Sequence, residues 1–149
     1  MPDYKTNTKI ARPLADVFQY LIDVTAWPKW MPVESTRPTD AGGVRIGMRA
    51  EGVMAEGGRR TPFAIEITGL EPNTSIAFRT LSGPIDWAGR WEVHAIDAGT
   101  TEVSSTGTIH LRGWRRLLEP LMAGEVQRNE TNELVRLRAA LEGHEASRP

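Results

Sequence analysis

A carboxyl group in the last third of this 149-residue chain, that of Glu125, is a candidate for acid–base chemistry, and the amide of Asn129 beside it is a candidate polar contact for a ligand. Glu125 and Asn129 are four residues apart in an amphipathic stretch that also contains Val126, and helical spacing predicts that all three share a face. If that face is interior, each polar group needs water, the other group or a ligand atom, because an unpartnered one costs about 2 kcal/mol. If it faces solvent, both are ordinary surface residues.

A second titratable group depends on one backbone detail. Trp91, Glu92, Val93 and His94 alternate between apolar and polar along a predicted strand. If Trp91 and Val93 point inward, Glu92 and His94 point outward. A bulge at Gly89 would shift the pattern by one residue and turn His94 inward. The apolar alternation argues against this shift, so the sequence favours a binding role over catalysis by Glu125 or His94.

Other kinds of chemistry have little support. The chain has no cysteine, and its three histidines lack the spacing of metal ligands, so we expect no metal and no cofactor. The net charge of −1 gives no general attraction to nucleic acid, which we do not expect as a partner. The first residues lack an apolar signal segment, so we expect a cytoplasmic protein.

Hydrophobic periodicity predicts the elements that position these groups. A strand at 4–10 precedes a helix that begins at Pro13 and ends near Asp23, followed by a short helical turn capped by Thr25. A long helix from about 113 ends at Glu142, with Pro120 as a kink or as its true start, and its apolar face rotates along its length. We expect one domain over 1–143 and a disordered tail over 144–149. Between the helices, turn residues separate six strands, predicted at 33–38, 45–55, 61–70, 75–81, 86–96 and 101–111.

This order of elements resembles a known superfamily in specific residues. The segment 10–21, with a strand that enters a helix at Pro13, and the tryptophan-rich segment 27–32 are similar to its bacterial polyketide cyclase/dehydrase and lipid-transport branch. Gly47, the segment 67–72 and the segment 99–101 also fit. The superfamily is the START and birch-pollen-allergen-like (SRPBCC) superfamily. The resemblance implies an α+β helix-grip fold, in which a curved antiparallel sheet of about seven strands wraps around a long C-terminal helix and two short helices follow the first strand.

In such a fold, the space between sheet and helix is either filled by side chains or left as a ligand cavity. Alternation along the strands and spacing along the helix predict which residues face it. The candidate ligand-binding residues are Met48, Ala50, Met54, Phe63, Ile65, Phe78, Thr80, Trp87, Trp91, Ser105, Met122, Val126 and Asn129. Trp27 and Trp30 lie where the short helices would close the cavity, as a gate or, on our preferred interpretation, as anchors of a short helix.

The leading hypothesis is therefore binding or transport of a small hydrophobic molecule, such as a lipid, an isoprenoid or a polyketide-like compound. One alternative is an enzyme that resembles polyketide cyclases and aromatases. Another is a protein-interaction module with a filled core. Arg112, Trp114, Arg115 and Arg116 form a small basic and apolar patch that suits a membrane surface, although a solvated helix edge explains it more simply.

Overall fold

The computed structural model describes residues 3–39, 41–56, 59–121 and 123–146. Strands and helices follow one another along these residues. These elements are β1 (Asp3–Ile10), α1 (Leu14–Ile22), the 3₁₀ helix η1 (Val24–Lys29), β2 (Val33–Pro38), β3 (Arg49–Glu56), β4 (Arg59–Glu71), β5 (Ser75–Ser82), β6 (Ile85–Asp97), β7 (Thr100–Leu111), the 3₁₀ helix η2 (Gly113–Leu121) and α2 (Ala123–Ala146).

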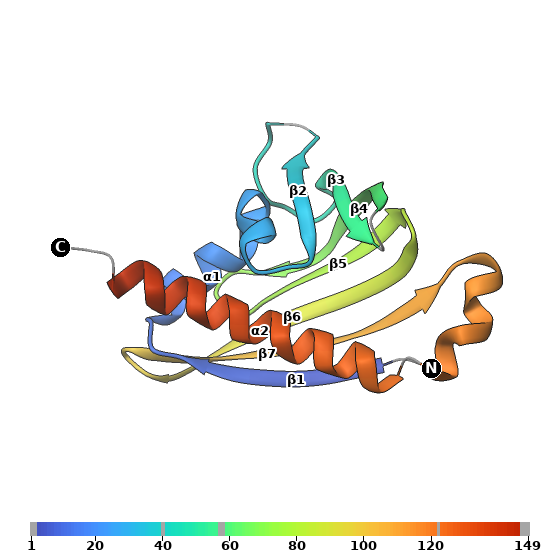
Figure 1. Ribbon diagram of the computed structural model, residues 1–149. Coiled ribbons are helices and arrows are strands. Elements are labelled where there is room, and N and C mark those ends of the chain that lie inside the picture. Colours follow the sequence, from blue (N-terminus) through green and yellow to red (C-terminus); the bar gives the residue numbers. More distant parts are fainter. Residues whose placement is uncertain (1–2, 40, 57–58, 122, 147–149) are drawn as a thin grey trace.

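The strands form one antiparallel sheet in the order β1-β7-β6-β5-β4-β3-β2. The sheet is curved, and α2 runs along one of its faces, in contact with β1, β7 and η1 (Figure 1). The predicted α+β arrangement, a curved seven-stranded sheet around a C-terminal helix with two short helices after the first strand, is confirmed.

The strand limits agree closely with the predicted ones, with one exception. β3 starts at Arg49 rather than at residue 45, because a turn occupies the preceding residues. The backbone N–H of Met48 donates to the carbonyl oxygen of Arg45 at 3.0 Å, and Gly47 has a φ of +90°, which favours glycine. The cap of η1 also differs from the prediction: the Asp23 carboxylate accepts a hydrogen bond from the Thr25 backbone N–H at 3.1 Å.

The inner face of α2 forms one continuous line, and the predicted rotation of its apolar face is wrong. Each of its buried residues has another buried residue three or four positions away along the chain, which is the spacing of one helix face. They are Val126, Glu130, Glu133, Leu134, Leu137 and Leu141. The sequence suggested two separate apolar faces because the first one included Leu118 and Leu121, which lie in η2 rather than in α2 and are exposed. α2 also continues through Gly143 to Ala146, past the predicted end at Glu142, and Pro120 lies in η2.

Aromatic rings fill the middle of the interior between η1 and the sheet. Phe78 and Trp91 are stacked with ring centroids 5.1 Å apart, and Trp27 and Trp30 meet Trp91 at 5.6 and 5.3 Å. Trp27 and Trp30 are fully buried, and the Trp27 indole N–H donates to the carbonyl oxygen of Leu21 at 2.9 Å. These contacts favour the interpretation that the two tryptophans anchor η1.

Two glycines make room for the Tyr4 side chain. The pairing of β6 with β7 is regular past Gly89, so the bulge considered for this position is absent and His94 stays outward and exposed. A Cβ atom at Gly89 would lie 2.9 Å from the Tyr4 hydroxyl oxygen, and one at Gly107 would lie 2.4 Å from it. Glycine is therefore needed here for close approach of a side chain rather than for a bulge.

We expect Gly107→Ala to lower the free energy of unfolding by about 1–3 kcal/mol. The new methyl group would also lie 2.4 Å from the carbonyl oxygen of Ala88, which belongs to the backbone and moves only if the β6–β7 pairing shifts. Gly99→Ala is the matched control, since its nearest neighbour would be 3.9 Å away. Urea unfolding measures both variants, and equal stabilities would contradict the prediction.

Candidate functional site

A cavity of about 220 Å³ lies between the first half of α2 and the ends of several strands. Its wall is mostly apolar. Two of the residues that line it, Pro32 and Asn129, are exposed, so the cavity opens to the surface beside them. The lining residues are Pro32, Met54, Pro84, Ile85, Trp87, Ile109, Leu111, Val126, Asn129, Glu130 and Glu133. A concave apolar space with a few polar groups is the usual form of a small-molecule site.

Four of the predicted ligand-binding residues line this cavity: Met54, Trp87, Val126 and Asn129. Phe63, Ile65, Phe78 and Thr80 surround an adjoining void of only about 10 Å³, which Met54 and Trp87 also line. Met48, Ala50, Trp91 and Ser105 are buried and line neither space. Met122 lies outside the described residues. Contact of any of these residues with a ligand stays a prediction.

Both weak catalytic candidates are misplaced for chemistry in the cavity. Glu125 is exposed, so of the two positions that the sequence left open, interior and solvent-facing, it has the solvent-facing one. His94 is exposed on the outer face of β6, as the strand alternation required. Thr80, one of the predicted ligand-binding residues, uses its hydroxyl group to stabilise the backbone. This group accepts a hydrogen bond from the Trp87 backbone N–H at 2.9 Å and donates one to the Ile85 carbonyl oxygen at 3.2 Å.

The titratable groups that do line the cavity are Glu130 and Glu133. They stand three residues apart on the inner face of α2, with side chains 3% and 1% exposed, and a hydrogen bond joins the two carboxyl groups. Glu130 Oε2 and Glu133 Oε1 are buried without any hydrogen-bond partner. We call these two residues the carboxyl pair.

Burial changes the acidity of the carboxyl pair. Desolvation raises the pKa of Glu130 to about 7, although the hydrogen bond from Glu133 and the positive charge of Arg136 oppose the shift. The pKa of Glu133 is also raised, first by desolvation and then by the negative charge of Glu130. Two buried carboxyl groups in contact do not both ionise readily, so the pair retains a proton near neutral pH.

Polar groups on neighbouring elements face the carboxyl pair. The Trp87 indole N–H donates to the Tyr4 hydroxyl oxygen at 2.8 Å, and desolvation together with the charges of Glu130 and Glu133 raises the pKa of Tyr4, which stays neutral. On the other side, Arg136 Nε donates to the carbonyl oxygen of Trp30 at 3.1 Å and so connects α2 to the residue that follows η1. The wall of the cavity thus combines apolar side chains with a carboxyl pair that retains one proton and has two buried oxygens without a partner.

Comparison with known proteins identifies the family. The model of the family described as polyketide cyclase / dehydrase and lipid transport matches residues 1–142. The chain belongs to this family. A comparison with curated proteins gives no match.

Solved structures share the fold of this family member. A START superfamily protein from Mycobacterium smegmatis aligns with a TM-score of 0.81 at 12% identity, over 95% of this chain and 97% of that one. TTHA0849 from Thermus thermophilus gives 0.78 at 22% identity, over 99% and 100% of the two chains. The ZhuI aromatase/cyclase from Streptomyces sp. R1128 gives 0.74 at 20% identity, over 94% and 93%. The resemblance to the START and birch-pollen-allergen-like superfamily is thus confirmed.

The carboxyl pair is what sequence reasoning missed in this family member. One signal for it was present: Val126, Glu130, Glu133, Leu137 and Leu141 follow one another at steps of three or four, the spacing of one helix face. Glutamates are rarely buried, so the apolar residues alone, without Glu130 and Glu133, define the predicted faces. Tyr4 was missed because the first strand appeared polar overall.

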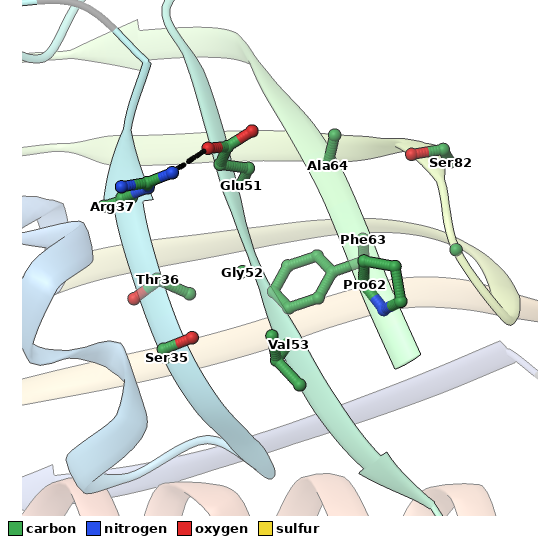
Figure 2. Close-up of a pocket in the computed structure, with 11 residues that line it drawn as sticks. Ser35, Thr36, Arg37, Glu51, Gly52, Val53, Pro62, Phe63, Ala64 and Ser82 are labelled. Carbon is green, nitrogen blue, oxygen red and sulfur yellow. Dashed lines mark hydrogen bonds and ion pairs between the residues drawn. The ribbon is translucent and has the colours of Figure 1, made fainter. Parts of the chain in front are cut away.

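A larger hollow of about 880 Å³ lies over β2, β3 and β4, and Figure 2 shows it. Most of its lining residues are solvent-facing, and Arg37 Nη2 lies 2.6 Å from Glu51 Oε1, so these two charges compensate each other. We place the candidate site of this family member in the smaller cavity, because a cleft with titratable groups of shifted acidity is the stronger indication of function.

The predicted membrane patch is described only in part. The side chains of Trp114, Arg115 and Arg116 lie outside the described residues. Arg112 Nη2 lies 4.0 Å from Asp86 Oδ1. Leu117 and Leu121 of η2 are exposed. In the described part of the chain, no helix has the length and apolar character needed to cross a membrane, and no cluster of three or more His, Asp or Glu side chains is arranged to hold a metal ion.

Proposed function

We propose that this chain binds a small hydrophobic molecule in the cavity between α2 and the sheet, as a binding or transport protein for a lipid, isoprenoid or polyketide-like compound. The observation that carries the proposal is the cavity itself, a space of about 220 Å³ whose wall is apolar except for Asn129 and the carboxyl pair. The family description, which includes lipid transport, supports it.

The proposal predicts that Val126→Trp weakens binding of 1-methylnaphthalene at least tenfold. Val126 lines the cavity and is 4% exposed, so a larger side chain there takes up the space of the ligand. Val135→Trp is the matched control, because Val135 lies on the same helix and is 57% exposed. Equilibrium dialysis measures the free hydrocarbon, and equal affinities for both variants would contradict the proposal.

Native purification gives an independent test. The protein is isolated from its expression host, denatured, and the released material analysed by mass spectrometry. A stoichiometric hydrophobic compound is expected. Protein that releases nothing and binds no apolar probe would favour the interaction-module hypothesis.

A second candidate function is catalysis of the cyclase or dehydratase type. The observation that favours it is the carboxyl pair, since a pair that retains one proton offers an acid and a base in the same cavity. Any compound released from the purified protein is incubated with the natural chain and with Glu133→Gln. Conversion by the natural chain alone would support catalysis, and no conversion by either would favour binding.

A further inference from the structure

The carboxyl pair is an unusual feature of the wall of this cavity. The other buried residues on the inner face of α2 are Val126 and three leucines, which cover the sheet at no electrostatic cost. Glu130 and Glu133 occupy two positions of the same line, and burying a carboxylate is expensive unless it is paired and hydrogen-bonded. Their presence therefore needs an explanation beyond packing.

Groups within the protein do not fully satisfy the pair. Among the described residues, the charged or titratable groups that act on it are Arg136 of α2 and Tyr4 of β1. Arg136 already donates its Nε–H to the Trp30 carbonyl oxygen, and the Tyr4 hydroxyl accepts from Trp87. Glu130 Oε2 and Glu133 Oε1 stay without a partner, and both residues line the cavity. These two oxygens therefore lack hydrogen-bond donors, and a ligand can supply them.

Charge indicates which kind of donor fits best. With one retained proton, the pair carries one negative charge, which Arg136 balances. A ligand ammonium group brings one positive charge and up to three N–H donors, so it supplies donors for both carboxyl groups and favours ionisation of the second one. A hydroxyl group brings one donor and no charge. Charge-assisted hydrogen bonds are the stronger ones, particularly in an apolar space.

We propose that the cavity selects a compact apolar amine, whose ammonium group binds to Glu130 Oε2 and Glu133 Oε1 while its hydrocarbon part contacts the wall formed by residues such as Trp87 and Val126. On binding, the pair releases its retained proton to solvent, and the complex holds two carboxylates, the ligand cation and Arg136. The inference rests on the proposed function and specifies its ligand class.

Three probes with one carbon skeleton test it: 1-naphthylmethylamine, 1-naphthalenemethanol and 1-methylnaphthalene. At pH 8 the natural chain is expected to bind the amine at least tenfold more tightly than the alcohol, with release of about one proton, measured by calorimetry in buffers of different ionisation enthalpy. The affinity for the amine is expected to rise from pH 6 to pH 8, because the proton that must leave the pair is held less tightly at higher pH.

The double variant Glu130→Gln/Glu133→Gln is expected to lose the preference for the amine and to keep the affinity for the hydrocarbon. Glu125→Gln removes an exposed carboxylate from the same helix and should leave all three affinities unchanged. Hydrocarbon binding without a preference for the amine would overturn this inference and leave the proposed function intact. Failure of all three probes to bind would overturn both.

Discussion

The free energy of unfolding of the natural chain is expected to fall by about 3 kcal/mol between pH 5 and pH 7.5, and Glu130→Gln/Glu133→Gln is expected to remove most of this fall. Both carboxyl groups are buried, and their raised pKa means that the folded protein holds protons that the unfolded chain has released. The effect is a large part of the stability of a typical domain, which is about 5–15 kcal/mol.

The direction follows from proton counting. An unfolded glutamate titrates near its usual pKa of 4.5, whereas Glu130 in the folded chain titrates at about 7. Between these values the folded state binds more protons, so stability decreases as pH rises. The contribution of Glu130 is fully present below the lower value and is lost above the higher one. Glu133 extends the same trend, since its pKa is also raised.

Urea unfolding at half-unit pH steps measures this effect, with Glu125→Gln as the control that should retain the natural profile. Glu125 is exposed on the same helix, so it tests the loss of one carboxylate without the change in burial. A natural chain whose stability is constant from pH 5 to pH 7.5 would contradict the prediction. A double variant whose free energy of unfolding falls with pH as steeply as that of the natural chain would also contradict it.

The strands could be predicted well because local alternation and turn residues determine them. On β6, for example, Trp87, Trp91 and Val93 are buried and Glu92 and His94 exposed, as a period of two requires. The predicted inner faces hold even at Thr80 and Ser105, which are polar yet buried. The short turns between the strands also predict that consecutive strands pair as antiparallel hairpins, whereas the curvature of the sheet around the C-terminal helix was implied by the family resemblance.

The candidate site was harder to predict because a few long-range contacts decide it. The space beside the cavity depends on how Trp27, Trp30, Phe78 and Trp91 pack together, and these side chains come from the η1 region and from the hairpin of β5 and β6, about 50 residues further along the chain. The rotation of α2 depends on which line of residues meets the sheet. Spacing alone left Glu125 open between interior and solvent and did not single out Glu130 and Glu133.

The aromatic cluster therefore limits the ligand as much as the cavity wall does. Met54 and Trp87 line both the cavity and the void of about 10 Å³, so the two spaces adjoin. Phe78 lines the void, stacks on Trp91 and meets the Trp87 ring at 5.0 Å. Its ring occupies volume that would otherwise extend the cavity toward η1.

Phe78→Ala is expected to lower the free energy of unfolding by about 3–5 kcal/mol, because it removes a buried ring and leaves a space that its rigid neighbours fill only in part. The same space joins the void to the cavity, so the variant should bind 9-methylanthracene at least tenfold more tightly, relative to 1-methylnaphthalene, than the natural chain does. Phe78→Leu is the matched control, since it keeps most of the volume and should cause a smaller change in both quantities.

Urea unfolding and equilibrium dialysis with the two hydrocarbons measure the two effects separately. A loss of stability without any change in relative affinity would mean that the aromatic cluster holds the fold together but does not set the length of the site. The larger hydrocarbon would then be excluded elsewhere, at the mouth near Pro32 and Asn129, where the lining residues are exposed. A gain for the larger hydrocarbon in Phe78→Ala alone would instead assign ligand size to the packing of η1 against the sheet.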